Sequence, residues 1–173
     1  FAGLEGNEET AISNFNDSHL ETSKISRGKG LTARNFGDSF SASNWGIYNI
    51  PTSVADSNYM EFAIRPKTGY KFIVSSVYMQ MRRSDFGRVA VVLRSSLDGF
   101  SSDLDQQFPI VDDNNKQSFT FSFNHQSHQK VVYRIYMYAE AEEGTASIGG
   151  FANDDIIVYG MTEHIDSKDQ III

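Results

Sequence analysis

The chain has 173 residues, contains no cysteine and carries a formal net charge of −7. A domain of this length can fold without disulfides or metal, and the absence of cysteine excludes thiol catalysis and zinc–thiolate sites. The acidic balance argues against nucleic acid as a partner, and no window is apolar for long enough to cross a membrane as a helix.

The first fifty residues are rich in Gly, Asn, Ser and Asp, which predicts long ordered loops rather than a second domain. Two short strands are expected there, at residues 24–26 and 30–33, on either side of a glycine turn. The next segment, residues 59–65, alternates apolar and polar side chains with period two, which predicts a half-buried strand. Its inward residues are Met60, Phe62 and Ile64.

Residues 72–83 and 88–96 carry the same alternation and are separated by the turn sequence Ser84-Asp-Phe-Gly87. We therefore expect the two segments to form a β-hairpin, with their apolar faces in one core. The inward residues are Val77, Met79 and Met81 from the first segment and Val89, Val91 and Leu93 from the second.

Three further strands are expected at residues 118–123, 131–138 and 155–159, and the polar residues 124–128 predict a loop. No segment has a convincing helical stripe. Many short strands with turn sequences between them predict an all-β fold, a jelly-roll-like β-sandwich that is mostly antiparallel. We expect one domain over residues 1–160, followed by a polar tail or linker over residues 161–173.

The sheet face opposite the apolar one is the first candidate binding surface. Residues 61–100 carry seven Lys and Arg against three Asp and Glu, so the acidic chain has a basic middle. If the strands that contain residues 78–82, 90–94 and 134–138 are neighbours, their polar side chains share one face. These side chains are Tyr78, Gln80, Arg82, Arg94, Arg134, Tyr136 and Tyr138.

Tyrosine, arginine and glutamine are suited to binding sugars. An aromatic ring stacks on the apolar face of a pyranose, and amide and guanidinium groups bond to hydroxyls, carboxylates and sulfate esters. Trp45, with Tyr48 on the same predicted loop, is a second stacking candidate. The alternative is structural: tyrosines fill the core, arginines pair with acids, and Trp45 packs internally.

Calcium is the cofactor that the composition favours, because Ca²⁺ takes several oxygen ligands from loops. Glu5 and Glu8 near the start of the chain, and Asp155 near its end, lie in oxygen-rich segments. The first and last strands of a sandwich often lie side by side, which would bring these segments together. Solvated acidic loops are the simpler interpretation, because the sequence has no spaced calcium-loop motif.

The sequence carries no catalytic motif: it has no nucleophile elbow, no phosphate-binding loop and no dinucleotide fingerprint. His125 and His128 are close enough in sequence to share a metal, but no third ligand of a suitable type is adjacent. Solvated loop histidines are the simpler interpretation. The neighbouring carboxylates Asp112-Asp113 and Asp154-Asp155 would point to opposite faces of a strand. We therefore expect a protein that is not an enzyme.

Several short segments form a characteristic set: Ser26-Arg-Gly-Lys-Gly-Leu31, Tyr59-Met-Glu-Phe62, Gly69-Tyr70, Met81-Arg-Arg-Ser84, Ser96-Leu-Asp-Gly-Phe100, Tyr133-Arg-Ile-Tyr136 and Asn153-Asp-Asp-Ile156. As a set they resemble a family of extracellular modules from multidomain proteins secreted by marine and related Bacteroidetes. That family is similar to the jelly-roll carbohydrate-binding modules attached to polysaccharide-degrading enzymes. The resemblance implies a secreted accessory domain rather than a particular ligand.

With the resemblance, the candidate face predicts a carbohydrate-binding module that anchors a secreted glycoside hydrolase or lyase to a polysaccharide. The arginines favour an anionic algal polymer, sulfated or rich in uronate. The expected partners are that polysaccharide and a covalently attached catalytic domain, and we expect an extracellular monomer that binds neither nucleic acid nor membrane. Because the sequence begins with Phe1 rather than Met, we expect a processed chain or part of a longer protein.

Two alternatives to the binding module remain open. One is a structural or adhesive β-sandwich that spaces domains or docks proteins. The other is a polysaccharide lyase on a jelly-roll scaffold, which needs a tyrosine or histidine base beside an arginine. Tyr136 and Arg134 meet that description in sequence.

Overall fold

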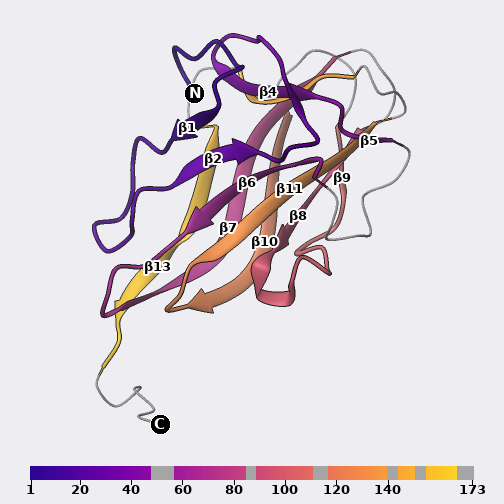
Figure 1. Ribbon diagram of the computed structural model, residues 1–173. Coiled ribbons are helices and arrows are strands. Elements are labelled where there is room, and N and C mark those ends of the chain that lie inside the picture. The colour runs from indigo at the N-terminus through magenta and orange to yellow at the C-terminus, as the bar shows by residue number, and fades with distance from the viewer. Residues whose placement is uncertain (48–56, 85–88, 111–116, 140–143, 151–154, 167–173) are drawn as a thin grey trace.

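The computed structural model describes residues 1–47, 57–84, 89–110, 117–139, 144–150 and 155–166 (Figure 1). The regular secondary structure of this part of the chain is all β-strand apart from one short 3-10 turn, η1 (Ser96–Asp98). It forms two mainly antiparallel sheets that enclose one core, which confirms the predicted all-β sandwich. Among these residues, no helix is long and apolar enough to cross a membrane.

The first sheet has seven strands within the described ranges, and β5 (Gly46–Ile47) joins it by pairing in parallel with the end of β11. The order of the other six is β1 (Thr10–Ile12), β2 (Lys24–Arg27), β6 (Tyr59–Ile64), β11 (Val131–Ala139), β8 (Val89–Ser95) and β9 (Phe108–Ile110).

The second sheet is built around β7 (Tyr70–Arg83), the longest strand. Its order is β10 (Gln117–Ser127), β7, β12 (Ala146–Gly149), β4 (Ser39–Ser43) and β3 (Thr32–Ala33), and β13 (Ile156–His164) also pairs with β7. Because β10 and β13 pair with the same stretch of β7, they lie on its opposite sides. β12 and β13 therefore follow one another along one side of β7.

The core lies between the sheets and consists of the inward sides of the alternating strands. Met60, Val77, Met79 and Met81 are fully buried, as their spacing in sequence predicts. The largest buried side chains also include Phe40, Phe72, Phe121, Tyr133 and Ile135. The sequence-based assignment of inward and outward faces is thus confirmed for the described side chains of β6, β7, β8 and β11, whereas the side chain of Val89 lies outside the described residues.

The predicted hairpin between β7 and β8 is wrong, because β7 belongs to the second sheet and β8 to the first. The two strands bury their apolar faces in the same core from opposite sides. A half-buried strand has the same alternation whether its neighbour in sequence pairs with it or faces it across the core. Periodicity alone therefore could not separate the two arrangements.

Two predicted strand ends are also wrong. Residues 124–127, expected in a loop, continue β10, which passes a bulge between Ser122 and His125. Residues 161–164, expected in the tail, continue β13, which has a second register shift between Tyr159 and Gly160. In both places the strand is more polar than the half-buried pattern: Asn124 and Gln126 on β10, and Glu163 and His164 on β13, are exposed.

Candidate functional site

The first predicted binding surface is the outer face of the first sheet. β8 and β11 are neighbours, as predicted, and their register places Arg134 opposite Arg94 and Tyr136 opposite Val92. Tyr136 is only 1% exposed, so this face is covered. The side chain of Tyr138 lies outside the described residues.

Both arginines of this face are engaged within the protein. The Nε of Arg134 lies 3.0 Å from a carboxylate oxygen of Glu61, and its guanidinium lies 3.9 Å from the ring centres of both Tyr59 and Phe100. Arg94 pairs with Asp103 at 2.6 Å. A guanidinium held by a carboxylate and two rings is a structural support, since its charge is already compensated.

The other half of the predicted surface is on the opposite sheet. Tyr78, Gln80 and Arg82 lie on β7, so the prediction that they share a face with Arg94 and Arg134 is wrong. The guanidinium of Arg82 lies 2.8 Å from the centre of the Phe36 ring, and burial lowers its pKa. The three predicted arginines therefore do not converge.

Trp45 also has a place in the interior. Its ring is 2% exposed within the hydrophobic core, and its indole N–H donates to the carbonyl of Ala42 at 2.9 Å. In this arrangement the ring presents no face for a ligand to stack on. Tyr48, its predicted companion, lies outside the described residues.

The outer face of the second sheet carries two tyrosines among small hydroxyl side chains, and we call it the tyrosine face. Tyr78 on β7 lies between Thr120 on β10 and Ile157 on β13, and Ser76 lies between Ser122 and Tyr159. The members of the tyrosine face are Ser76, Tyr78, Ser118, Thr120, Ser122, Ile157 and Tyr159.

Tyr159 and Tyr78 are diagonal neighbours across β13 and β7, a placement that separates side chains by about 7–8 Å. Tyr159 is 49% exposed, and Ser118, Thr120 and Ser122 are exposed as well. The hydroxyl of Tyr78 is held within 2.9 Å of the Ser118 hydroxyl and of the Gln80 amide nitrogen. The tyrosine face is therefore accessible, and Tyr78 is fixed in orientation.

Every side chain of the tyrosine face is uncharged. The carboxylate of Asp105 lies at its β10 edge, where it accepts the backbone N–H of Ser122 at 2.7 Å, and other charged groups lie toward its two ends. Arg82 lies toward one end, on the ring of Phe36. Lys71 and Glu163 pair with each other at 3.1 Å toward the other end. Sequence analysis identified Tyr78 but missed Tyr159, because the role of Tyr159 depends on the pairing of β13 with β7.

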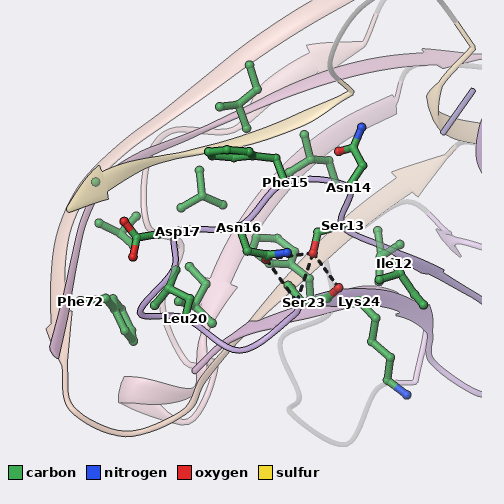
Figure 2. Close-up of a pocket in the computed structure, with 18 of the residues that line it drawn as sticks. Ile12, Ser13, Asn14, Phe15, Asn16, Asp17, Leu20, Ser23, Lys24 and Phe72 are labelled. Atoms are coloured by element: carbon green, nitrogen blue, oxygen red, sulfur yellow. Dashed lines mark hydrogen bonds between the residues drawn. The ribbon is translucent and has the colours of Figure 1, made fainter. Parts of the chain in front are cut away.

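A groove of about 820 Å³ opens between the edges of the two sheets, and Figure 2 shows it with its principal lining residues. Its base reaches the core residues Phe62 and Phe72, and part of its rim is formed by residues 13–17. Four of the six exposed large apolar side chains found in the described residues line it. They are Ile12, Phe15, Val158 and Met161.

The segment that carries Phe15 is attached to β13 by side chains. Thr162 donates its hydroxyl hydrogen bond to Asp17 at 3.1 Å, and the His19 ring nitrogen lies 3.1 Å from the same hydroxyl. The backbone N–H of His19, hydrogen-bonded to the Asp17 carboxylate, lowers the pKa of that carboxyl group. The His19 ring stacks on Tyr70 at 4.0 Å, which holds the segment beside the sheet.

The residues predicted to bind calcium have other contacts. The carboxylate of Glu8 accepts hydrogen bonds from the backbone N–H groups of Glu5 and Gly6. Asp155 contacts the backbone nitrogen of Phe1, so the first and last segments do come together. No cluster of three or more metal-ligating acids or histidines occurs within the described part of the chain, and calcium binding stays a prediction.

The residues weighed for catalysis are placed as follows. His125 lies on β10 rather than in a loop, and burial lowers its pKa. Tyr136, the base that a lyase would require, is 1% exposed beside the paired Arg134. Asp112, Asp113 and Asp154 lie outside the described residues.

Comparison with known protein families finds no family model that matches this chain, and no curated protein sequence matches it either. The resemblance to extracellular carbohydrate-binding-type modules therefore stays a prediction. The tyrosine face and the groove are the surface features of the described residues that bear on function.

Proposed function

We propose that this chain is a non-catalytic polysaccharide-binding domain and that its ligand lies across the tyrosine face. The observation that carries the proposal is the pair of tyrosines, Tyr78 and Tyr159, on adjacent strands of an exposed face bordered by hydroxyl groups. Two rings set diagonally on a sheet can stack on successive sugars of an extended chain. Serine and threonine hydroxyls donate and accept hydrogen bonds with sugar hydroxyls.

The charge of the face favours a neutral polysaccharide. Its members are uncharged, and the arginines that suggested an anionic ligand are paired with acids or stacked on rings. On the first sheet, Arg94 and Arg134 both pair with carboxylates, so the charges of these two guanidinium groups are already compensated within the protein. We therefore retain polysaccharide binding, as expected from the sequence, and replace the expected anionic polysaccharide with a neutral one.

The setting of the domain is part of the proposal. We infer a secreted, monomeric module that holds an attached glycoside hydrolase or lyase on its substrate, as the resemblance in sequence implies. The uncharged face favours a neutral glycan over nucleic acid, which requires a basic footprint. A structural calcium near Glu5, Glu8 and Asp155 remains compatible with the proposal but is not needed for it.

Affinity electrophoresis against neutral and anionic polysaccharides tests the function. A neutral polysaccharide should retard the domain, and Tyr159→Ala should weaken affinity several-fold, since an aromatic contact contributes about 0.5–1.5 kcal/mol. Phe15→Ala is the matched control: it also removes an exposed ring, but from the groove, and it should leave retardation unchanged.

Two results would contradict the proposal. Retardation only by anionic gels, lost in Arg134→Ala, would return the site to the first sheet. Absence of retardation in every gel would favour the structural or adhesive domain.

A further inference from the structure

Three aspartates lie in η1 and in the loop that follows it, and two of them are engaged on the side of the first sheet. Asp98 accepts hydrogen bonds from two backbone N–H groups of the loop, at 3.2 and 3.0 Å. Asp103 pairs with Arg94 at 2.6 Å. Asp105 turns to the second sheet instead, where its Oδ2 accepts the backbone N–H of Ser122 on β10 at 2.7 Å. The loop therefore brings one carboxylate to the edge of the tyrosine face.

The position of Asp105 is fixed from both sheets. The preceding residue, Leu104, donates its backbone N–H to the carbonyl of Leu93 on β8 at 2.9 Å, and its side chain packs against the hydrophobic core. The Oδ1 of Asp105 accepts the backbone N–H of Gln106 at 2.7 Å, so each carboxylate oxygen holds one N–H group. A group that is already held in place loses little freedom when a ligand binds to it.

The carboxylate of Asp105 retains hydrogen-bonding capacity. An ionised carboxylate has about four lone-pair positions, and the two backbone N–H groups occupy one on each oxygen. The residue is partly exposed, and within the described ranges no lysine, arginine or histidine forms an ion pair with it. The remaining lone pairs can therefore accept hydrogen bonds from the hydroxyl groups of a ligand.

The carboxylate of Asp105 lies close to the stacking ring of Tyr78. Ser122, whose N–H it accepts, is two residues along β10 from Thr120, the residue opposite Tyr78. Two residues of a strand span about 7 Å. The hydroxyl groups of a sugar stacked on Tyr78, or of the next sugar along the polymer, therefore come within reach of the carboxylate. Thr120 and Ser122 are both exposed along this stretch.

We propose that Asp105 determines the specificity of the tyrosine face: it accepts hydrogen bonds from the hydroxyl groups of a neutral sugar and repels the carboxylate or sulfate of an anionic one. This inference rests on the proposed function, because it concerns the ligand of the same face. A hydrogen bond from a hydroxyl group to a carboxylate is about twice as strong as one between neutral groups. A negative charge on the ligand at the same place is disfavoured by Coulomb repulsion, most strongly at low salt.

Binding isotherms with two forms of one polysaccharide test this role on the full 173-residue chain. The first probe is a neutral hexose polysaccharide that retards the domain in affinity electrophoresis, and the second is the same polymer oxidised at C6 to the uronate. We expect Asp105→Asn to bind the neutral form about tenfold more weakly, the difference between a charged and a neutral hydrogen bond. It should bind the uronate form several-fold more tightly than the wild type does at low salt, and added salt should reduce that difference.

Two further variants separate the carboxylate from other effects. Asp105→Glu keeps the charge and should still disfavour the uronate form. Asp17→Asn removes the same charge beside the groove, where Asp17 is about half-exposed, and it should leave the preference between the two forms unchanged. Asparagine at position 105 keeps an oxygen that can accept the N–H of Ser122, and cooperative urea unfolding of each variant shows that the sandwich is intact. The wild type gives a measurement without substitution: added salt should strengthen its binding of the uronate form and leave that of the neutral form unchanged.

The outcomes distinguish this inference from the proposed function. If Tyr159→Ala weakens binding of the neutral form but Asp105→Asn leaves the preference unchanged, the inference is wrong and the proposed function stands. Asp105 would then serve only to block the edge of β10 against pairing with another chain. Equal changes in Asp17→Asn and Asp105→Asn would also overturn the inference, because net charge alone would set the preference. If the wild type binds no neutral polysaccharide, the proposed function and the inference are both wrong.

Discussion

Arg134 shows how the surroundings of one side chain change its interpretation. From the sequence it is an exposed cation on a candidate binding face, whereas in the fold it lies between the rings of Tyr59 and Phe100 with Glu61 as its counter-ion. The planar guanidinium can stack on both rings while its edge reaches the carboxylate, which an ammonium group cannot do. These contacts favour a contribution of Arg134 to stability over one to recognition.

Substitution of Arg134 separates these two roles. We expect Arg134→Ala to lower the free energy of unfolding by about 1–2 kcal/mol, the sum of a partly buried ion pair and two ring contacts. The free energy of unfolding of Arg134→Lys should lie between those of Arg134→Ala and the wild type, because lysine keeps the charge but loses the stacking on the rings. Urea denaturation measures both. Unchanged stability together with lost glycan affinity would show instead that Arg134 contacts the ligand.

At the scale of the element, β13 connects the two surfaces of interest. Its outer side contributes Ile157 and Tyr159 to the tyrosine face, and its inner side contributes Val158 and Thr162 to the groove. The register shift between Tyr159 and Gly160 keeps this alternation aligned with β7 on both sides of the bulge. The absence of a side chain at Gly160 allows β13 to approach β7 closely at that point.

A methyl group at position 160 should disturb this approach. A Cβ there would lie 2.1 Å from the carbonyl oxygen of Ile73 and 3.1 Å from the Cα of Val74, both backbone atoms that cannot move aside independently. We expect Gly160→Ala to cost about 1–3 kcal/mol of unfolding free energy. Gly37→Ala is the control, because nothing lies within 4 Å of its added Cβ, and its effect should stay within about 0.5 kcal/mol.

Thermal unfolding followed by circular dichroism compares the two glycine variants. If Gly160→Ala and Gly37→Ala both unfold at the wild-type temperature, then glycine is not required at the bulge. In that case β13 lies farther from β7 at position 160 than the contact distances above indicate. A loss of glycan affinity in Gly160→Ala without a loss of stability would mean that the tyrosine face depends on the register of β13 alone.

At the scale of the whole molecule, Arg27 joins the two sheets. It lies on β2 of the first sheet, and its Nε donates to the carbonyl of Ser41 on β4 of the second sheet at 2.9 Å. Its two terminal nitrogens donate to the carbonyls of Gly6 and Glu8, and its guanidinium lies 3.6 Å from the ring centre of Phe40. Burial lowers the pKa of Arg27 to about 10, which leaves the group charged at neutral pH.

Removal of this connection should destabilise the sandwich as a whole. We expect Arg27→Met, which keeps the apolar stem, to lower the free energy of unfolding by about 2–4 kcal/mol, because three carbonyls lose a charged donor. Arg65→Met is the control: Arg65 is half-exposed, with Glu21 3.6 Å away, and such pairs contribute about 0–1 kcal/mol. Equal effects of the two substitutions in urea denaturation would contradict the role assigned to Arg27.

Much of the fold was predictable because its information is local. The period-two alternation of residues 59–65, 72–83 and 131–138 follows directly from the geometry of a strand, so the sequence assigned inward and outward faces correctly. It also predicted an all-β sandwich without helices. Strand ends were less predictable: β10 and β13 run past their apolar stretches, and there the pairing with β7 continues through mostly polar residues.

The candidate site was predictable only in part. Tyr78 and Gln80 were identified from their strand, but Tyr159 was not, and Arg82, Arg94, Arg134 and Trp45 proved to be engaged inside the protein. An ion pair such as Arg134 with Glu61 joins residues 73 positions apart. Nothing in the local sequence of either residue indicates that partner.

By itself the sequence determined the fold class, the strands and the side of each strand that faces the core, because each of these depends on neighbours a few residues away. Tertiary structure decided which strands are neighbours, and therefore that β7 faces β8 across the core instead of pairing with it. It also decided which arginines form ion pairs with carboxylates and where two tyrosines lie together on an exposed face. The physical reason is that strand pairing is a contact between distant segments. The partner of a strand is selected when all strands pack together around the core, because one alternating pattern is compatible with several partners.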